Sequence, residues 1–357
     1  MKRPYLYDHL PFVFDFAQTP ERFEVEELPS IIPLAKGNYA LLLVQKREMS
    51  TLQLIDVLAK AAGANRRDVG YAGLKDKHAL TCQYITLPRY ALRNLARGLR
   101  SSRIEILATH YAKKPLRIGE LKGNRFRIVL EAMPPEEAKR FEALLPQIAN
   151  EGFANFFGFQ RFGVDQANWQ EGKILAHQGG RLRTPAERLR VGVYQSYLFN
   201  AWLGARCELS LLSDQGRNDA IAERFGYEKP VIEMLKVQPQ RFKLLEGETM
   251  RIRGRLHTLP LDEAIEAFRA KTSVPTGLLS GKGVRRARGV AGELEAAFDD
   301  RWLDALRGDR RDAWGYATDT QCRYDATHQR MEVRFSLAKG AYATVFLEEI
   351  AKRPLKR

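Results

Sequence analysis

The sequence has few cysteines, no long apolar run and no low-complexity segment. Its three cysteines, Cys82, Cys207 and Cys322, lie far apart, form no C-x-x-C spacing, and make no plausible zinc set with the six histidines. Such a sparse and odd count fits a reducing compartment. Asp8 and Pro11 interrupt the amino-terminal residues, which excludes a signal peptide there, and no run approaches the length of a membrane span. We therefore expect a cytoplasmic protein.

Composition indicates a folded protein with a polyanionic partner. The 357 residues suffice for two domains, or for one domain with a large insertion. A hydrophobic share of 45% with 10% aromatic residues supports real cores. Lys and Arg outnumber Asp and Glu by 58 to 43, a net charge of +15. Nucleic acid is the usual partner of such a chain, although a generally basic protein has the same balance.

One short segment, residues 70–79 (GYAGLKDKHA), combines loop-forming glycines with a carboxylate between two lysines. The glycines predict a tight loop. The neighbouring charges of Lys75 and Lys77 favour the ionised form of Asp76 and attract a polyanion. A carboxylate is a poor phosphate ligand, so Asp76 needs another role. In an arbitrary protein, however, a Lys-Asp-Lys sequence usually forms a solvent-exposed turn without a functional role.

The flanking residues predict a rigid mount for this loop. Residues 50–53 (STLQ) form a capping-box pattern that begins a helix, and Gly63 ends it. Residues 83–87 then return as a strand. The loop would therefore lie between a helix and a strand.

A cationic segment, residues 110–123, leads into a strand with alternating character. Phe126 belongs to the apolar face of this strand, and Arg125 and Arg127 to the other face. Taken alone, Phe126 is more often a core residue than a binding residue, and Asn124 suits a turn.

Two aromatic segments lie further along the chain. Residues 155–163 (NFFGFQRFG) pack best as core, but the polarity of Gln160 and Arg161 indicates a cleft or RNA. Residues 338–344 place Tyr342 after a glycine turn.

The middle of the chain has helical periodicity. A four-residue spacing from Leu294 through Phe298 and Trp302 to Leu306 predicts one helix with a single apolar face. Residues 274–277 (VPTG) are expected to form a turn. A glycine-rich loop before that helix carries cations that suit phosphate contacts: Lys282, Arg285, Arg286 and Arg288.

Residues 68–81 (DVGYAGLKDKHALT) resemble the active-site motif of the TruD family of RNA pseudouridine synthases in a long, ungapped match. Residues 110–128, 155–163 and 338–350 resemble further stretches of the same family, and residues 20–27 resemble its start. The middle of the chain is matched only sparsely.

The resemblance implies an α+β pseudouridine synthase fold with a mixed, largely antiparallel sheet, interrupted by a TruD-specific α/β insertion domain. Residues 1–154 and 305–357 would form the catalytic domain, and residues 155–304 the insertion. The active site would lie in a basic cleft between the two.

The resemblance assigns the catalytic carboxylate to Asp76. Phe126 and Tyr342 would lie against the target base, and Asn124 would orient Asp76 or the substrate. Many members carry a lysine at the position of Ala17, so the cation that pairs with Asp76 is unassigned here. Other implied contacts to the RNA come from Lys75, Lys77, Gln160 and Arg161.

The implied activity is the isomerisation of a uridine in transfer RNA to pseudouridine, at uridine 13 in the family's bacterial members. This reaction exchanges a C1′–N bond for a C1′–C5 bond and requires no metal or cofactor. Asp76 would act either as a nucleophile on the sugar or base, or as a base on a sugar proton. We expect transfer RNA as the partner, no membrane, no obligate protein partner and a monomer.

Two other hypotheses use the same residues. A non-catalytic RNA-binding protein would act normally without the carboxylate of Asp76. A base-directed glycosylase would release free uracil and leave an abasic site. Neither hypothesis accounts for all of the matching stretches.

Overall fold

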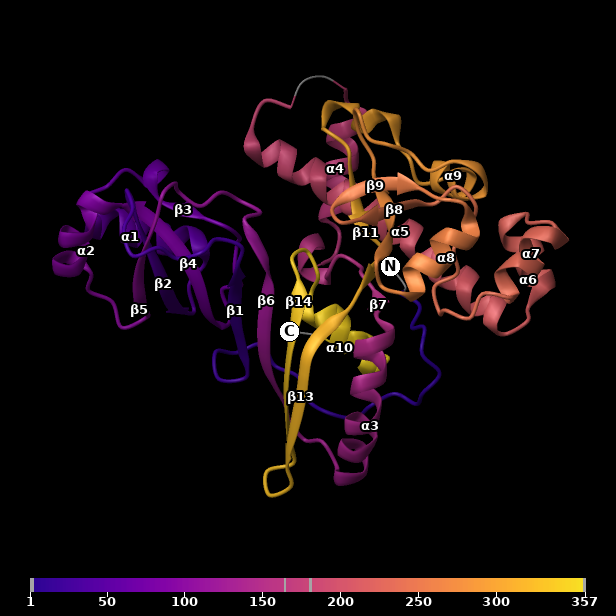
Figure 1. Cartoon of the computed structure of the whole chain (residues 1–357), viewed down its shortest axis with the longest axis horizontal. Coiled ribbons are helices and arrows are strands. Elements are labelled where there is room, and N and C mark those ends of the chain that lie inside the picture. The colour runs from indigo at the N-terminus through magenta and orange to yellow at the C-terminus, as the bar shows by residue number, and fades with distance from the viewer. Residues whose placement is uncertain (1–2, 164, 180–181, 356–357) are drawn as a thin grey trace. The chain divides into compact units, whose positions relative to one another are not determined.

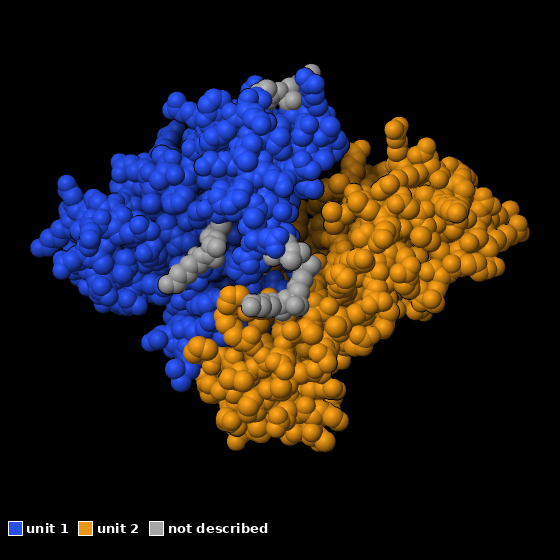
Figure 2. Space-filling view, turned by 180° about the vertical axis from the view of Figure 1, so that it is seen from behind, with its two compact units in different colours: residues 1–10, 151–315, 344–352 blue, residues 11–150, 316–343, 353–357 orange. Residues whose placement is uncertain are grey.

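The structure, a computed structural model, describes residues 3–163, 165–179 and 182–355, and the chain forms two compact units (Figures 1 and 2). Unit 1 contains residues 1–10, 151–315 and 344–352, and unit 2 contains residues 11–150, 316–343 and 353–357. The expected insertion, residues 155–304, lies within unit 1.

Unit 1 also contains segments that were expected in the catalytic domain, namely residues 1–10, 151–154, 305–315 and 344–352. The Tyr7 hydroxyl donates to the Gly152 carbonyl at 2.6 Å, and the Leu6 amide donates to the Glu349 carboxylate at 2.6 Å. Such contacts between residues more than 140 positions apart are not visible as sequence periodicity. The two amino- and carboxyl-terminal segments therefore belong to the same compact unit as the insertion.

Unit 2 is built on an eight-stranded sheet with the order β13-β14-β6-β1-β4-β2-β5, in which β3 pairs with β4. All of its strand pairs are antiparallel except β1 with β4, which confirms the expected mixed, largely antiparallel sheet. The elements of this unit are β1 (Phe23–Pro29), β2 (Tyr39–Arg47), α1 (Thr51–Ala62), η1 (Arg66–Asp68), β3 (Gly70–Tyr71), β4 (Leu80–Pro88), η2 (Arg89–Ala91), α2 (Leu92–Gly98), β5 (Ile104–Ala112), β6 (Leu121–Leu130), α3 (Pro135–Glu151, whose last residue is assigned to unit 1), β13 (Ala317–Asp325) and β14 (Arg330–Ala338).

The helix α1 forms where the capping box predicts it. The Ser50 hydroxyl accepts from the Gln53 backbone amide, and the Gln53 side-chain oxygen accepts from the Ser50 backbone amide. Gly63 ends the helix with φ 61°. The apolar face of α1 packs on one face of the sheet, with Leu42 of β2 and Ile85 of β4 in the same core. The amino-terminal end of α1 is thereby fixed against the strands that flank the Asp76 loop.

Unit 1 is mostly helical around α5, whose 30 residues begin with a capping box between Thr184 and Glu187. A four-stranded sheet has the order β11-β10-β8-β9. Among the described residues, no helix is long and apolar enough to cross a membrane. The elements are β7 (Phe153–Ala154), η3 (Phe159–Phe162), α4 (Asn168–His177), α5 (Pro185–Asp214), α6 (Asn218–Phe225), α7 (Lys229–Lys236), β8 (Thr249–Ile252), β9 (Arg255–Thr258), α8 (Leu261–Arg269), β10 (Ser273–Leu279), α9 (Gly289–Ala296), η4 (Arg301–Ala305), β11 (Asp309–Asp312), β12 (Trp314–Gly315) and α10 (Ala343–Ala351).

Two sequence-based expectations in unit 1 were wrong. Residues 274–277 are part of β10 and form no turn. Gly277 is needed there for packing, because a Cβ atom at this position would lie 2.2 Å from the Trp202 ring. The single helix expected from Leu294 to Leu306 does not form, since α9 ends at Ala296 and η4 follows it, and Trp302 is 56% exposed.

We predict that Gly123→Ala destabilises unit 2. An alanine Cβ would lie 2.1 Å from the Leu337 carbonyl oxygen, so β6 and β14 would have to move apart. Overpacking of this kind costs about 1–3 kcal/mol. Thermal unfolding should show a lower Tm for Gly123→Ala and an unchanged Tm for Lys122→Ala, an exposed neighbour on the same strand. An equal Tm for Gly123→Ala and the intact protein would contradict the prediction.

Candidate active site on the central sheet

Asp76 lies half-buried in the loop between β3 and β4, and buried contacts hold the residues around it. The Lys75 amide donates to the Thr51 hydroxyl at 2.8 Å, at the first residue of α1. The Lys46 ammonium donates to the carbonyl oxygen of Asp76 itself at 2.9 Å, and to the Met49 carbonyl at 2.5 Å. The backbone of Asp76 is therefore fixed from both β2 and α1.

The Lys75 side chain anchors the loop a second time. Its ammonium forms an ion pair with the Glu27 carboxylate at 2.5 Å, and these two side chains are 4% and 1% exposed. Glu27 also accepts from the Tyr84 amide. The sequence suggested that Lys75 binds the substrate, but the structure places its charge inside the unit, against a carboxylate. Lys77, by contrast, is exposed.

Strand register puts Lys46 and Phe126 in one row on the same face of the sheet. Across the row, Lys46 pairs with Thr81, Thr81 with Val25, Val25 with Phe126, and Phe126 with Phe335. Neighbouring strands lie about 4.8 Å apart, so the backbones of β2 and β6 are separated by roughly 14 Å along this row. The side chains on this face lie beside or beneath the Asp76 loop.

Phe126 is a core residue by its contacts. Its ring stacks on Phe335 at 5.4 Å and meets the Phe23 ring edge-on at 6.1 Å, and the residue is 6% exposed. Only a small part of this ring is open to a target base. The contact with the base that the family resemblance implies therefore stays a prediction.

Asn124 lies in the next row, between Glu27 of β1 and Leu337 of β14. Within the part of the chain that the structure describes, Asn124 Oδ1, Thr81 Oγ1 and Gln83 Nε2 are buried polar atoms without a hydrogen-bond partner. Such atoms are normally satisfied by ordered water or a ligand. The face that carries Asp76 therefore has three side-chain atoms with unmet hydrogen-bonding capacity near the loop.

The remaining predicted residues divide between the units. Tyr342 is half-buried and follows β14 in unit 2, where the Lys339 amide donates to the Lys122 carbonyl at the start of β6. Gln160 and Arg161 belong to η3 of unit 1, and Arg161 donates from Nε to the Ser196 hydroxyl at 3.1 Å. Their role toward the RNA stays a prediction.

The sequence analysis missed Lys46, Glu27 and Thr51 as parts of the site. Lys46 carried a usable signal, because it continues the buried alternation of Leu42 and Val44 in β2 although it is a lysine. A lysine at a buried strand position requires partners. Among the described residues, no group of three or more His, Cys, Asp or Glu side chains is arranged to hold a metal ion.

Burial changes the chemistry of Lys46. Removal of its ammonium from water lowers the pKa of Lys46 from 10.5 to about 8. The negative charge of Asp76 opposes this change, and the positive charge of Lys75 adds to it. The ammonium thus provides positive charge near Asp76 at neutral pH.

We predict that burial of Lys46 makes the stability of unit 2 depend on pH. Between about pH 8 and pH 10.5 the unfolded chain holds the Lys46 proton and the folded chain releases it, so the folded state gains stability as the pH rises. Relative to Lys46→Met, the free energy of unfolding of the intact protein should rise by up to about 3 kcal/mol across this window. Chemical denaturation at a series of pH values measures it. A constant difference would contradict the prediction.

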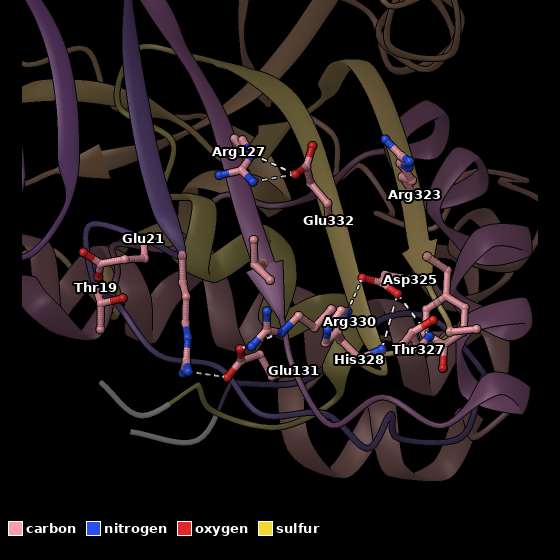
Figure 3. A pocket seen from close by; sticks show the side chains of 14 residues that line it. Thr19, Glu21, Arg127, Glu131, Arg323, Asp325, Thr327, His328, Arg330 and Glu332 are labelled. Atoms are coloured by element: carbon pink, nitrogen blue, oxygen red, sulfur yellow. Dashed lines mark hydrogen bonds and ion pairs between the residues drawn. The ribbon is translucent and has the colours of Figure 1, made fainter.

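A groove of about 1110 Å³ lies on the opposite face of the sheet (Figure 3). It is lined by Arg127 and Glu332, which form an ion pair, and by Glu131, which binds both Arg22 and Arg330. Arg127 alternates with Phe126 along β6 and so points away from the Asp76 face. Because its guanidinium groups are largely paired with carboxylates, this groove is a poor site for phosphate.

Comparison with known proteins supports one family over nearly the whole chain. The model of the family described as "tRNA pseudouridine synthase D (TruD)" matches residues 2–179 and 175–350. A protein named tRNA pseudouridine synthase D from a Nitratiruptor species is 38% identical, and one from Wolinella succinogenes is 37% identical; each comparison covers 100% of this chain and 99% of the relative.

A solved structure has the same fold. The crystal structure of the putative tRNA pseudouridine synthase D (TruD) from Methanosarcina mazei has a TM-score of 0.69 to this chain at 19% identity. The similarity covers 99% of this chain and 96% of the other. At this identity the comparison establishes the fold alone.

Proposed function

The chain belongs to the TruD family of transfer RNA pseudouridine synthases, and we propose that it isomerises one uridine of transfer RNA, using Asp76 as its catalytic carboxylate. The uridine base detaches from C1′, turns, and rejoins C1′ through C5. The observation that carries the assignment of Asp76 is the set of buried contacts that fixes the residues around it.

We assign separate tasks to the residues around Asp76. Lys46 holds the backbone of Asp76 and places positive charge close to it. Lys46 would thus supply the cation near Asp76 that many family members have as a lysine at the position of Ala17. The Lys75–Glu27 pair positions the loop from within the unit. Asp76 reacts either as a nucleophile or as a base, and the same arrangement serves both.

The RNA contacts are proposed for exposed or partly exposed groups. Lys77 binds phosphate, Asn124 hydrogen-bonds the base or Asp76, and Tyr342 stacks on the base that has left the RNA helix. Removal of a base from its stack costs a few kcal/mol, and stacking on an aromatic ring recovers roughly 1–3 kcal/mol of it. Gln160 and Arg161 bind the RNA from unit 1. We further expect a cytoplasmic monomer.

We predict that Asp76→Asn abolishes pseudouridine formation. The amide has the shape of the carboxylate but neither its charge nor its basicity, so transfer RNA affinity should stay within about twofold while product falls below detection. The assay incubates unmodified transfer RNA with each protein and quantifies pseudouridine after nuclease digestion. Free uracil from the intact protein would instead identify a glycosylase. Equal pseudouridine from both proteins would refute the role of Asp76.

The position of the target follows from the family's bacterial members, so we predict uridine 13. Chemical mapping of pseudouridine along a transfer RNA transcript should give one signal at position 13. A transcript with cytidine at position 13 should give none, and a transcript with cytidine at another loop position serves as the control. Product at a different position would reject this target while leaving the reaction in place.

A further inference from the structure

Trp302 is an exposed aromatic side chain that the proposed reaction does not use. It lies in η4 of unit 1 and is 56% exposed, whereas Trp202 and Trp314 are 2% and 3% exposed. The helix α9 ends before η4 begins, so Trp302 does not lie on the apolar helix face that its spacing predicts. A single exposed aromatic side chain is common on protein surfaces, so the groups near Trp302 decide whether it is a binding residue.

A hydrogen-bonded network holds the backbone of Trp302 and the imidazole ring next to its indole. Asp300 Oδ2 lies 2.7 Å from His177 Nε2 and accepts from the Tyr194 hydroxyl at 2.8 Å. Asp300 Oδ1 accepts from the Trp302 amide at 3.0 Å and caps η4. The His177 and Trp302 rings lie 5.8 Å apart with 34° between their planes. The backbone and one side of Trp302 are thus held, and its other surface remains open.

Three exposed cations accompany the ring. Arg301 precedes it, and Arg307 follows beyond the end of η4. Lys282 lies beside Arg307, since its amide donates to the Leu306 carbonyl at 2.9 Å and its carbonyl accepts from the Gly308 amide at 3.0 Å. Within the described ranges of the chain, none of these three cations has an ion pair or a side-chain hydrogen bond.

The neighbouring acidic groups do not neutralise these cations. Asp299 binds Arg286 and the Ser280 hydroxyl. Asp300 is committed to the network with His177 and Tyr194 described above. Asp304 and Asp309 are the exposed carboxylates that remain close in sequence, and Asp309 accepts from the Arg310 amide. This part of unit 1 therefore offers an exposed aromatic ring and, on adjoining segments of the chain, three exposed cations that form no ion pair among the described residues.

We propose that Trp302 is a stacking platform for an unpaired nucleotide of the substrate RNA, with Lys282, Arg301 and Arg307 as phosphate contacts. Proteins that hold single-stranded nucleic acid combine the same two elements, an aromatic ring for the base and cations for the backbone. The net charge of +15 favours a polyanion here over a second apolar surface. This assignment rests on the proposed function for the identity of the RNA, and it assigns Trp302 to substrate binding and not to chemistry.

The test compares Trp302→Ala, Trp302→Leu and Trp302→Phe, with Val237→Ala as a control at another exposed apolar position of unit 1. Loss of the ring should raise the KM for transfer RNA at least about fivefold with kcat unchanged. Trp302→Phe should keep most of the affinity, and Trp302→Leu should behave like Trp302→Ala. Parental KM values for all variants, or a fall in kcat alone, would overturn the proposal.

A binding measurement separates this proposal from the proposed function. Unmodified transfer RNA should quench the tryptophan fluorescence of the Asp76→Asn protein, and the added change Trp302→Phe should remove most of this quenching. Quenching that depends on Trp302 without pseudouridine from the intact protein would leave the platform in place and reject the reaction. Pseudouridine formation with quenching that is independent of Trp302 would reject the platform alone.

Discussion

The buried ion pair between Lys75 and Glu27 is the contact on which the Asp76 loop depends. It joins the residue before Asp76 to β1, the strand that links the two halves of the sheet in unit 2. Removal of one partner from such a pair leaves an uncompensated charge and typically costs about 3–5 kcal/mol. The Lys46 and Thr51 contacts are built on the same face, so the loop is fixed by β1, β2 and α1 together.

Successive side chains of each strand point to opposite faces of the sheet in unit 2, so the two faces have different chemical environments. One face carries Asp76, the unsatisfied side-chain atoms of Thr81, Gln83 and Asn124, and the aromatic row that includes Phe126. The other carries the cross-strand ion pairs around Arg127 and a large groove. This groove is large, but its arginine side chains are largely paired with carboxylates. We propose the other face for the reaction, because a carboxylate is held in place there among cations and unsatisfied hydrogen-bonding groups.

Local features of the fold could be predicted from the sequence because short-range rules determine them. The capping box at Ser50, the αL position at Gly63 and the alternation of β6 each depend on residues a few positions apart. The glycines and lysines of the 70–79 segment identified the loop. The family resemblance then gave the sheet class and the choice of Asp76, which periodicity alone does not provide.

Other features depend on contacts between distant residues and could not be predicted. The burial of Lys75 requires Glu27, which is 48 positions away. Gly277 was predicted to lie in a turn because glycine and proline are common in turns. Its actual reason is close packing against Trp202, a tertiary contact that the local sequence does not reveal. Trp302 fits a helical stripe by spacing, yet the Asp300 cap ends that periodicity. In each case the residue type was unusual for its position, but the contact that explains it involves a residue that the local sequence pattern does not identify.

The most direct test of the account is the crystal structure of the Asp76→Asn protein bound to transfer RNA. The account predicts that the target uridine lies outside its helix against the Asp76 face of unit 2, with C1′ within reach of the residue 76 side chain. The Lys46 and Lys75–Glu27 contacts should be unchanged. A uridine in the groove beside Arg127, or one that remains stacked in the RNA, would contradict the account.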